Sequence, residues 1–399
     1  MAQRNELLCD HIKTPIVKQN GEWNTVPCIN LSSHDYLDIS FDDLTHQYQR
    51  YRYKIVPMTW DWKPDTRLLT SEFLLKGIGD EPIEDYAESI NTSVAYTHYS
   101  FRFPAPNTEF KLSGNYLIVV YDDSDNDVLK IPFMVAENLA SLSAQVTTNT
   151  DIDFNNRHQQ ITLSLIPKIN IRYPEREIHI VALQNGSPLN AAINPMPDFV
   201  TPTEIKWLRS RSLIFSAGNE FRKFELTTLR FGGMGIDHIR WFSPYYHATL
   251  NTDKPASNYI YDEDTNGAFL IKTIDFDDSD LESDYVLTHF SLKSDPLPTT
   301  TTIYVDGNFA GPSPSEEQKM TYNPTTQCYE TTLLLKQGYY NYRYITFSNN
   351  GKSIIDDKPE GNFYQTENRY TIYAYYCAQG SRRDRLIAVS DFRFLASRK

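Results

Sequence analysis

Residues 333–344 read LLLKQGYYNYRY, and two related runs lie on either side, IYVDGNF at 303–309 and YTIYAYY at 370–376. Large and polar side chains alternate in these runs, and Gly and Asn residues separate them. This pattern is typical of antiparallel strands joined by turns. The segment from Ile303 to Tyr376 is therefore predicted to form a β-sandwich module. It contains no arrangement typical of a catalytic centre, so the question becomes what it binds.

The composition favours several all-β domains. A chain of 399 residues is too long for one ordinary core, and 40% hydrophobic residues suffice for two or three packed domains. The chain contains 27 Tyr and 21 Phe residues, which fit pleated β surfaces. An alternative cause of this aromatic content is a recognition surface, where Tyr is also enriched.

The charge and the hydropathy pattern exclude several classes of partner. The net charge of −13 argues against nucleic acid or anionic lipid, because both require clustered Lys and Arg. The chain has no apolar run of about 18 residues, so no membrane-spanning helix is predicted. It begins Met1-Ala2-Gln3 without an apolar signal core. Either the protein is cytosolic or a signal peptide has been removed, and the Ala-Gln pair suits a cleavage junction.

Three tandem sandwiches are predicted: an N-terminal one over residues 1–137, a central one over 138–294 and a C-terminal one over 295–399. Asn20-Gly21 is a strong hairpin signal, and Asn185-Gly186 is predicted to turn the chain after a strand at 177–183. Residues 115–121 and 128–135 are predicted to form a hairpin around the polar turn 122–127. The acidic stretch 275–284 is expected to be a solvated loop, and Ser294 to Pro298 is expected to be a linker.

The four cysteines permit two predicted disulfides. Cys9 and Cys28 lie near the start of the chain, and Cys328 and Cys377 lie near its end. No pair has the CxxC spacing of zinc or redox sites. In an oxidising compartment each end would pair within itself, whereas four separate buried thiols are the alternative.

No motif indicates a metal site, a cofactor or catalysis. Residues 122–127 and 262–267 resemble parts of calcium loops, but the second loop has Thr273 where a bidentate Glu is needed, so both are interpreted as turns. His238 and His247 lie nine positions apart and could meet across a hairpin, without a third ligand. Gly232 to Gly235 lacks the ending of a phosphate loop and is interpreted as a flexible or bulged turn. The carboxylates cluster in turn-like runs where burial is not expected, so the chain is predicted not to be an enzyme.

The C-terminal module is similar to early-set immunoglobulin-like domains, a group that includes glycogen- and starch-binding modules. The similarity is carried by residues 304–309, 320–323 and 336–344. It implies a glycan-binding envelope protein as one hypothesis. Sugar binding needs exposed aromatic platforms, and no Trp follows Trp241.

A second resemblance covers nearly the whole chain. The residues that carry it are YTHY at 96–99, SGNY at 113–116, VYD at 120–122, AGNEFR at 217–222, DTNGAF at 264–269, DYV at 284–286, 335–344, EGN at 360–362 and TEN at 366–368. In order and spacing they resemble the type IX secretion system plug protein family. Residues 58–59 depart from this pattern, because a more polar stretch is expected before Asp61-Trp62.

The second resemblance implies an exported, periplasmic, non-enzymatic protein that occludes a large outer-membrane translocon barrel. Such a protein needs a rigid body and a reversible protein interface with aromatic anchors. The candidate contacts are Trp241, Phe242, Tyr245 and Tyr246, together with Met234 in the Gly-rich loop. The alternative is that the four aromatic residues pack in a domain core.

Overall fold

The computed structural model describes residues 4–201, 203–348 and 359–395, and almost all regular structure in these ranges is β. The helices are single four-residue turns: α1 Thr70–Phe73, α2 Pro174–Glu177 and α3 Ser279–Glu282. In the described ranges no helix is long and apolar enough to cross a membrane. The predicted all-β class is confirmed. The predicted cleavage junction at Ala2-Gln3 lies outside the described residues.

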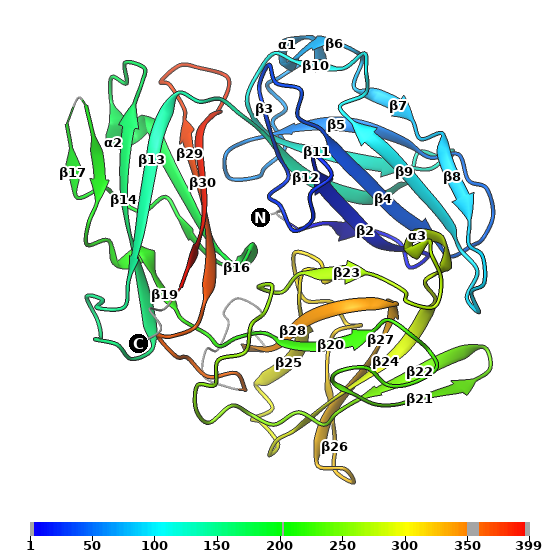
Figure 1. The fold of residues 1–399 in the computed structure, drawn as a ribbon. Coiled ribbons are helices and arrows are strands. Elements are labelled where there is room, and N and C mark those ends of the chain that lie inside the picture. The colour runs from blue at the N-terminus through cyan, green and yellow to red at the C-terminus, as the bar shows by residue number, and fades with distance from the viewer. Residues whose placement is uncertain (1–3, 202, 349–358, 396–399) are drawn as a thin grey trace.

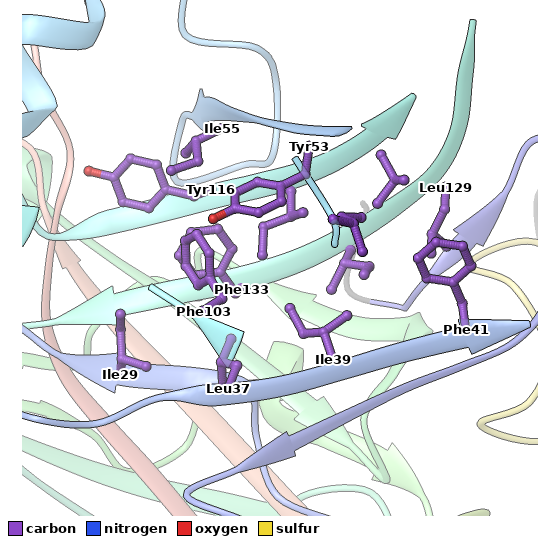
Figure 2. Close-up of a cluster of buried hydrophobic side chains, with 14 of the residues drawn as sticks. Ile29, Leu37, Ile39, Phe41, Tyr53, Ile55, Phe103, Tyr116, Leu129 and Phe133 are labelled. Carbon is purple, nitrogen blue, oxygen red and sulfur yellow. The ribbon is translucent and has the colours of Figure 1, made fainter. Parts of the chain in front are cut away.

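The first unit is a sandwich of two mainly antiparallel layers with an additional two-stranded sheet. One layer has the order β1-β12-β11-β5-β7 with β3 on β12, the other has the order β2-β4-β9-β8, and β10 pairs with β6. The bounds are β1 Glu6–Leu7, β2 Ile12–Gln19, β3 Cys28–Asn30, β4 Leu37–Asp43, β5 Arg52–Met58, β6 Leu74–Lys76, β7 Asp80–Pro82, β8 Asp85–Glu88, β9 Thr97–Phe103, β10 Glu109–Phe110, β11 Gly114–Tyr121 and β12 Asp127–Ala136. Figure 2 shows Ile39 and Phe41 of one layer beneath Tyr53 and Phe133 of the other.

The second unit combines the middle of the chain with its end. Its layers are β13-β14-β18-β17, with β19 on β14, and β16-β15-β29-β30. The bounds are β13 Ala140–Thr147, β14 His158–Pro167, β15 Ile178–Gln184, β16 Ser187–Ile193, β17 Phe199–Val200, β18 Ile205–Trp207, the 3₁₀ turn η1 Arg211–Leu213, β19 Ile214–Ser216, β29 Asn368–Tyr376 and β30 Arg385–Phe394. Trp207 lies in the core between the layers with Ile180 and Ile372.

The third unit is built from the remaining strands. Its layers are β20-β28-β23, with β25 on β28, and β21-β22-β24-β27-β26. The bounds are β20 Arg222–Leu226, β21 Ile236–Phe242, β22 Tyr245–Leu250, β23 Phe269–Ile271, β24 Tyr285–Lys293, β25 Thr301–Asp306, β26 Thr321–Asn323, β27 Cys328–Lys336 and β28 Gly338–Ser348. Phe224, Phe290 and Tyr340 pack in its core.

The strand pairing corrects the predicted division of residues 138–399 into two consecutive domains. β24 pairs with β27 along its whole length, so the predicted boundary at 294/295 cuts through one sheet. β29 pairs with β15, so the segment 303–376 belongs to two units and is not one module. Leu297, in the predicted linker, packs against the third core. Alternation identifies a strand, but its partner is chosen by packing between distant segments.

The hairpin predicted around residues 122–127 and the turn predicted at Asn185-Gly186 are both confirmed. β11 and β12 form the predicted hairpin, and Asn185 and Gly186 connect β15 to β16 with φ values of +53° and +62°. Asn20 and Gly21 also adopt positive φ, but only a single bridge, Gln19 to Glu22, follows from that turn. The tight turn was therefore predictable there, and the hairpin was not.

The three units surround the N-terminal end of the described chain (Figure 1). The β11–β12 layer is covered on both faces, because its second face packs against β15, β29 and β30 of the second unit. This explains why every residue of β11 is buried. Trp62 lies in this interface, and Trp60 stacks on His179 with ring centroids 4.3 Å apart. The units are thus joined by continuous packing and not only by linkers.

Candidate interaction surface

The β21–β22 hairpin projects from one edge of the third unit (Figure 1). Its turn contains Ser243 and Pro244, joined by a cis peptide bond. The register places Phe242 opposite Tyr245 and Trp241 opposite Tyr246. Both β-branched and aromatic residues favour this extended pairing. The four aromatic residues that the sequence singled out are therefore brought together at one hairpin tip.

The tip separates these residues into exposed and core-facing groups. Trp241 is 48% exposed and Phe242 is 58% exposed. Tyr246 packs against the third core, and its ring centroid lies 4.8 Å from that of Trp241. Core packing, the alternative considered for all four, therefore describes Tyr246, whereas Trp241 and Phe242 present apolar rings to solvent.

The Gly-rich loop carrying Met234 leads into β21 at the base of the same hairpin, opposite the aromatic tip. Met234 is 47% exposed, but its carbonyl oxygen accepts a 2.9 Å hydrogen bond from the Glu225 backbone N–H. A Cβ at Gly233 would overlap the Glu225 carbonyl oxygen, and Gly235 has φ +77°. The glycines thus allow the loop to pack closely on β20. The loop presents an exposed Met side chain on an anchored backbone.

The predicted meeting of His238 with His247 is replaced by a different pair. The register sets His238 opposite Thr249, and His247 Nδ1 instead lies 2.8 Å from His289 Nε2 on β24. Burial, His247 and His238 together lower the pKa of His289. Within the described residues no group of three His, Cys, Asp or Glu side chains could hold a metal ion.

Two carboxyl groups are more buried than the sequence suggested. Glu220 is 8% exposed, and its Oε1 accepts hydrogen bonds from the Tyr259 hydroxyl and the Glu367 N–H at 2.6 and 3.1 Å. Burial raises the pKa of Glu220 to about 7 and that of the partly buried Asp264 to about 6. Asp264 accepts hydrogen bonds from the Phe221 and Asn266 N–H groups. The expectation that carboxylates remain in solvated turns is therefore wrong here, because these turns lie between two units.

The sequence runs that carry the family resemblance meet at this same junction. Gly218 N–H donates to Asn362 Oδ1 at 2.9 Å, and Thr366 Oγ1 donates to the Gly218 carbonyl at 2.9 Å. Arg222 forms ion pairs of 2.9 Å with Asp253 and 3.0 Å with Glu360. These residues hold the second and third units together, so their role in the fold is structural.

The acidic stretch 275–284 is likewise a contact between units and not a purely solvated loop. The Asp284 carboxylate accepts hydrogen bonds from the Ser93 and Val94 N–H groups at 2.8 and 3.0 Å. Tyr96 donates its hydroxyl proton to backbone carbonyls of the same stretch. In the polar turn 122–127, Asp122 instead caps the turn by accepting from Ser124 and Asn126.

All four cysteines lie in described residues and are free thiols. Neither the Cys9–Cys28 nor the Cys328–Cys377 disulfide is formed. Cys328 is on β27 of the third unit, whereas Cys377 follows β29 and packs at the interface of the first two. Burial raises the pKa of Cys28 to about 12. Cys328 and Cys377 both lie near the end of the chain, but the fold places them in different units.

Comparisons with known proteins agree with this architecture. A model of the first domain of the type 9 secretion system plug protein matches residues 12–137. A crystal structure of a hypothetical protein from Parabacteroides merdae ATCC 43184, at 2.30 Å resolution, is 37% identical and superposes with a TM-score of 0.94. The match covers 98% of this chain and 99% of that chain. No curated protein matches the chain.

Proposed function

Because the chain belongs to the type 9 secretion system plug protein family, we propose that it acts in the periplasm as a non-enzymatic plug. In this proposal it binds the periplasmic end of a large outer-membrane translocon barrel and occludes it through a protein–protein interface. The family establishes a role related to type 9 secretion, and the surface features described above support the finer assignment. The main support for the proposed interface is the exposure of Trp241 and Phe242 at one hairpin tip.

Occlusion requires a body that keeps its shape, and the contacts between units support this requirement. The Lys336 ammonium and the Asp42 carboxylate link the third and first units at 2.6 Å, with side chains 2% and 1% exposed. Arg222 links the third unit to the segment that leads into β29. Breaking such buried pairs leaves an uncompensated charge, so rotation of one unit against another is opposed.

Reversible binding requires a few anchors that are available in the free protein. Trp241 and Phe242 supply two large rings at a hairpin tip. Met234, which precedes β21 at the opposite end of the hairpin, supplies a further exposed and adaptable side chain. Arg240 is exposed on the same strand, which adds a polar rim. We assign the translocon contact to these residues.

The test is co-purification with the barrel from gently solubilised envelopes of the source organism. The wild-type chain should retain a very large outer-membrane barrel, and a Trp241→Ser, Phe242→Ser double variant should retain at least about tenfold less. The matched control is Phe154→Ser, because Phe154 is 68% exposed but lies in the second unit. Failure of the wild-type chain to retain a barrel would refute the plug assignment. Equal retention by wild type and double variant would refute the assigned surface alone.

Glycan binding remains the second hypothesis, and the same rings favour it. The C-terminal tyrosines first considered as sugar platforms are mostly core residues: Tyr340, Tyr342 and Tyr344 are each at most 4% exposed. Trp241 and Phe242 are exposed and offer a sugar two adjacent rings to stack on. Soluble glucan or peptidoglycan fragments that bind the wild-type chain, and not the double variant, would support this hypothesis over the plug.

A further inference from the structure

A cavity of about 210 Å³ lies where the three units meet. On the same measure one water molecule requires only ~10–15 Å³. Its walls come from residues 23–27 of the first unit, Leu183 and Tyr373 of the second, and residues 268–271 of the third. Arg4 and Asn5 also line it. No single unit contains this cavity, so it exists only in the assembled molecule.

One residue of the lining, Arg4, belongs to a buried cluster with an excess of positive charge. Arg4 Nη1 and Arg343 Nε share the single carboxylate of Asp306, at 2.5 and 2.9 Å. Burial opposes ionisation of Asp306, but the two guanidinium groups outweigh it and hold the pKa of that carboxyl below its ordinary value. Two cations and one anion leave one net positive charge. Arg4 is only 7% exposed, so this charge is poorly solvated.

Three polar groups of the lining are available to hydrogen-bond or pair with a ligand. Within the described residues, Arg4 Nε and Asn266 Oδ1 have no hydrogen-bond partner, and Asn266 is 7% exposed. Lys18 lines the same cavity, and no ion pair joins it to any described residue. The acidic residue of the lining is the exposed Asp280. The cavity is therefore cationic in a chain whose net charge is −13.

The rest of the lining suits an organic molecule more than an inorganic anion. Trp23, Phe269, Pro27 and Leu183 supply apolar surface. The Trp23 indole N–H donates a 2.8 Å hydrogen bond to the Phe269 carbonyl, which fixes the ring across the junction of two units. Pockets that combine apolar walls with a few directed polar groups are typical of small-molecule sites.

We propose that this cavity binds a small organic carboxylate. The carboxylate accepts hydrogen bonds from Arg4 Nε–H and from the Lys18 ammonium, and it neutralises the excess charge of the Arg4–Asp306–Arg343 triad. A hydroxyl or amine of the ligand donates to Asn266 Oδ1, and an apolar body packs on Trp23 and Phe269. Because three units line the site, the bound ligand stabilises their assembly. This inference does not depend on the proposed plug function.

Calorimetric titration of the full chain with 2-hydroxyisovalerate, and with its uncharged amide as a matched probe, tests the proposal. The acid should bind and the amide should bind at least about tenfold more weakly, since only the acid makes charge-assisted hydrogen bonds. Lys18→Met should weaken the acid about tenfold, and Asn266→Asp should also weaken it by repelling the carboxylate. The control Lys63→Met should leave binding unchanged, because Lys63 is 76% exposed.

A crystal soaked with the acid should show it against Arg4 and Lys18. The proposal is overturned if neither compound binds, if the amide binds as well as the acid, or if the soaked cavity contains water alone. It is also overturned if Lys18→Met and Lys63→Met bind the acid equally. Should Asn266→Asp fail to fold, Lys18→Met decides, because no ion pair joins the Lys18 side chain to any described residue and the backbone pairing of Lys18 with Asp38 is kept.

Discussion

Lys336 donates a 2.6 Å hydrogen bond to Asp42, 294 positions away in the sequence. The same carboxylate accepts from His98 Nδ1 at 2.6 Å and from the Tyr285 hydroxyl at 2.7 Å. The Lys336 ammonium also lies 4.1 Å from the Tyr96 ring centroid. One buried carboxylate thus joins the first unit to two strands of the third.

Lys336→Met should lower the stability of the protein by roughly 3–5 kcal/mol, because it leaves Asp42 buried without its cation. The double variant Lys336→Met, Asp42→Asn should recover much of this loss, since both charges are then absent. Urea unfolding followed by circular dichroism measures both. Lys319→Met, which removes an exposed pair with Glu316, is the control and should not shift the midpoint. A midpoint for Lys336→Met equal to that of the control would contradict the prediction.

Glu220 should make the protein less stable as the pH rises from about 4 to about 7. The pKa of Glu220 is about 7 in the folded protein and ~4.3 in an unfolded chain, so within this window the folded state holds a proton that the unfolded state releases. Asp264, with a pKa of about 6, acts in the same direction. Above this window the penalty is complete and constant.

Glu220→Gln should therefore flatten the fall of the urea midpoint with pH and should be more stable than wild type at pH ~8. The lowered pKa of His289 contributes the opposite slope, but it is present in both proteins and cancels in their difference. The exposed Glu263→Gln variant serves as the control and should keep the wild-type slope. Parallel curves for Glu220→Gln and wild type would rule out this assignment.

Gly338 should tolerate no side chain. A Cβ there would overlap the Leu270 carbonyl oxygen of the neighbouring strand, so Gly338→Ala must push β23 away from β28. We expect a loss of about 2–4 kcal/mol by analogy with overpacked cores. Gly186→Ala is the matched comparison, because its Cβ meets nothing within 4 Å and only its φ of +62° is unfavourable. It should cost about 1 kcal/mol. Thermal unfolding that ranks the two variants in the reverse order would contradict this account.

The cysteines should react as four thiols only after unfolding. Burial raises the pKa of Cys9, Cys28 and Cys377, which lowers the thiolate fraction available for alkylation. Mass spectrometry after iodoacetamide treatment at pH ~8, without reductant, should show little modification of the folded protein and four adducts in denaturant. Two adducts or fewer in denaturant would indicate a disulfide and would revive the pairing predicted from sequence.

Several elements were predictable because their causes are local. Tyr51, Tyr53 and Ile55 alternate with basic residues in the sequence, and all three are buried in the structure. Asn185-Gly186 predicted a turn, because both residues adopt positive φ at little cost. The candidate aromatic cluster was also local, since Trp241, Phe242, Tyr245 and Tyr246 belong to one hairpin. Which of them faces solvent was not predictable, because both sides of that turn are aromatic.

The buried carboxyl groups and the cavity between the units were not predictable, because both depend on contacts between distant segments. The pKa values of Glu220 and Asp264 are raised by burial against segments distant in the sequence. No local sequence pattern indicates that burial. The junction cavity requires all three units, and the pairing of β15 with β29 joins segments about 190 positions apart.

By itself the sequence determined the all-β class, most strands and their inner faces. It did not determine which individual side chains are exposed. Periodicity and turn chemistry act over a few residues, so they can be recognised in the sequence alone. The tertiary structure alone decided which strands share a sheet, where the units divide, which carboxyl groups are buried and which rings remain at the surface. Those choices arise from packing between distant segments, in which the burial of one surface depends on the shape of another.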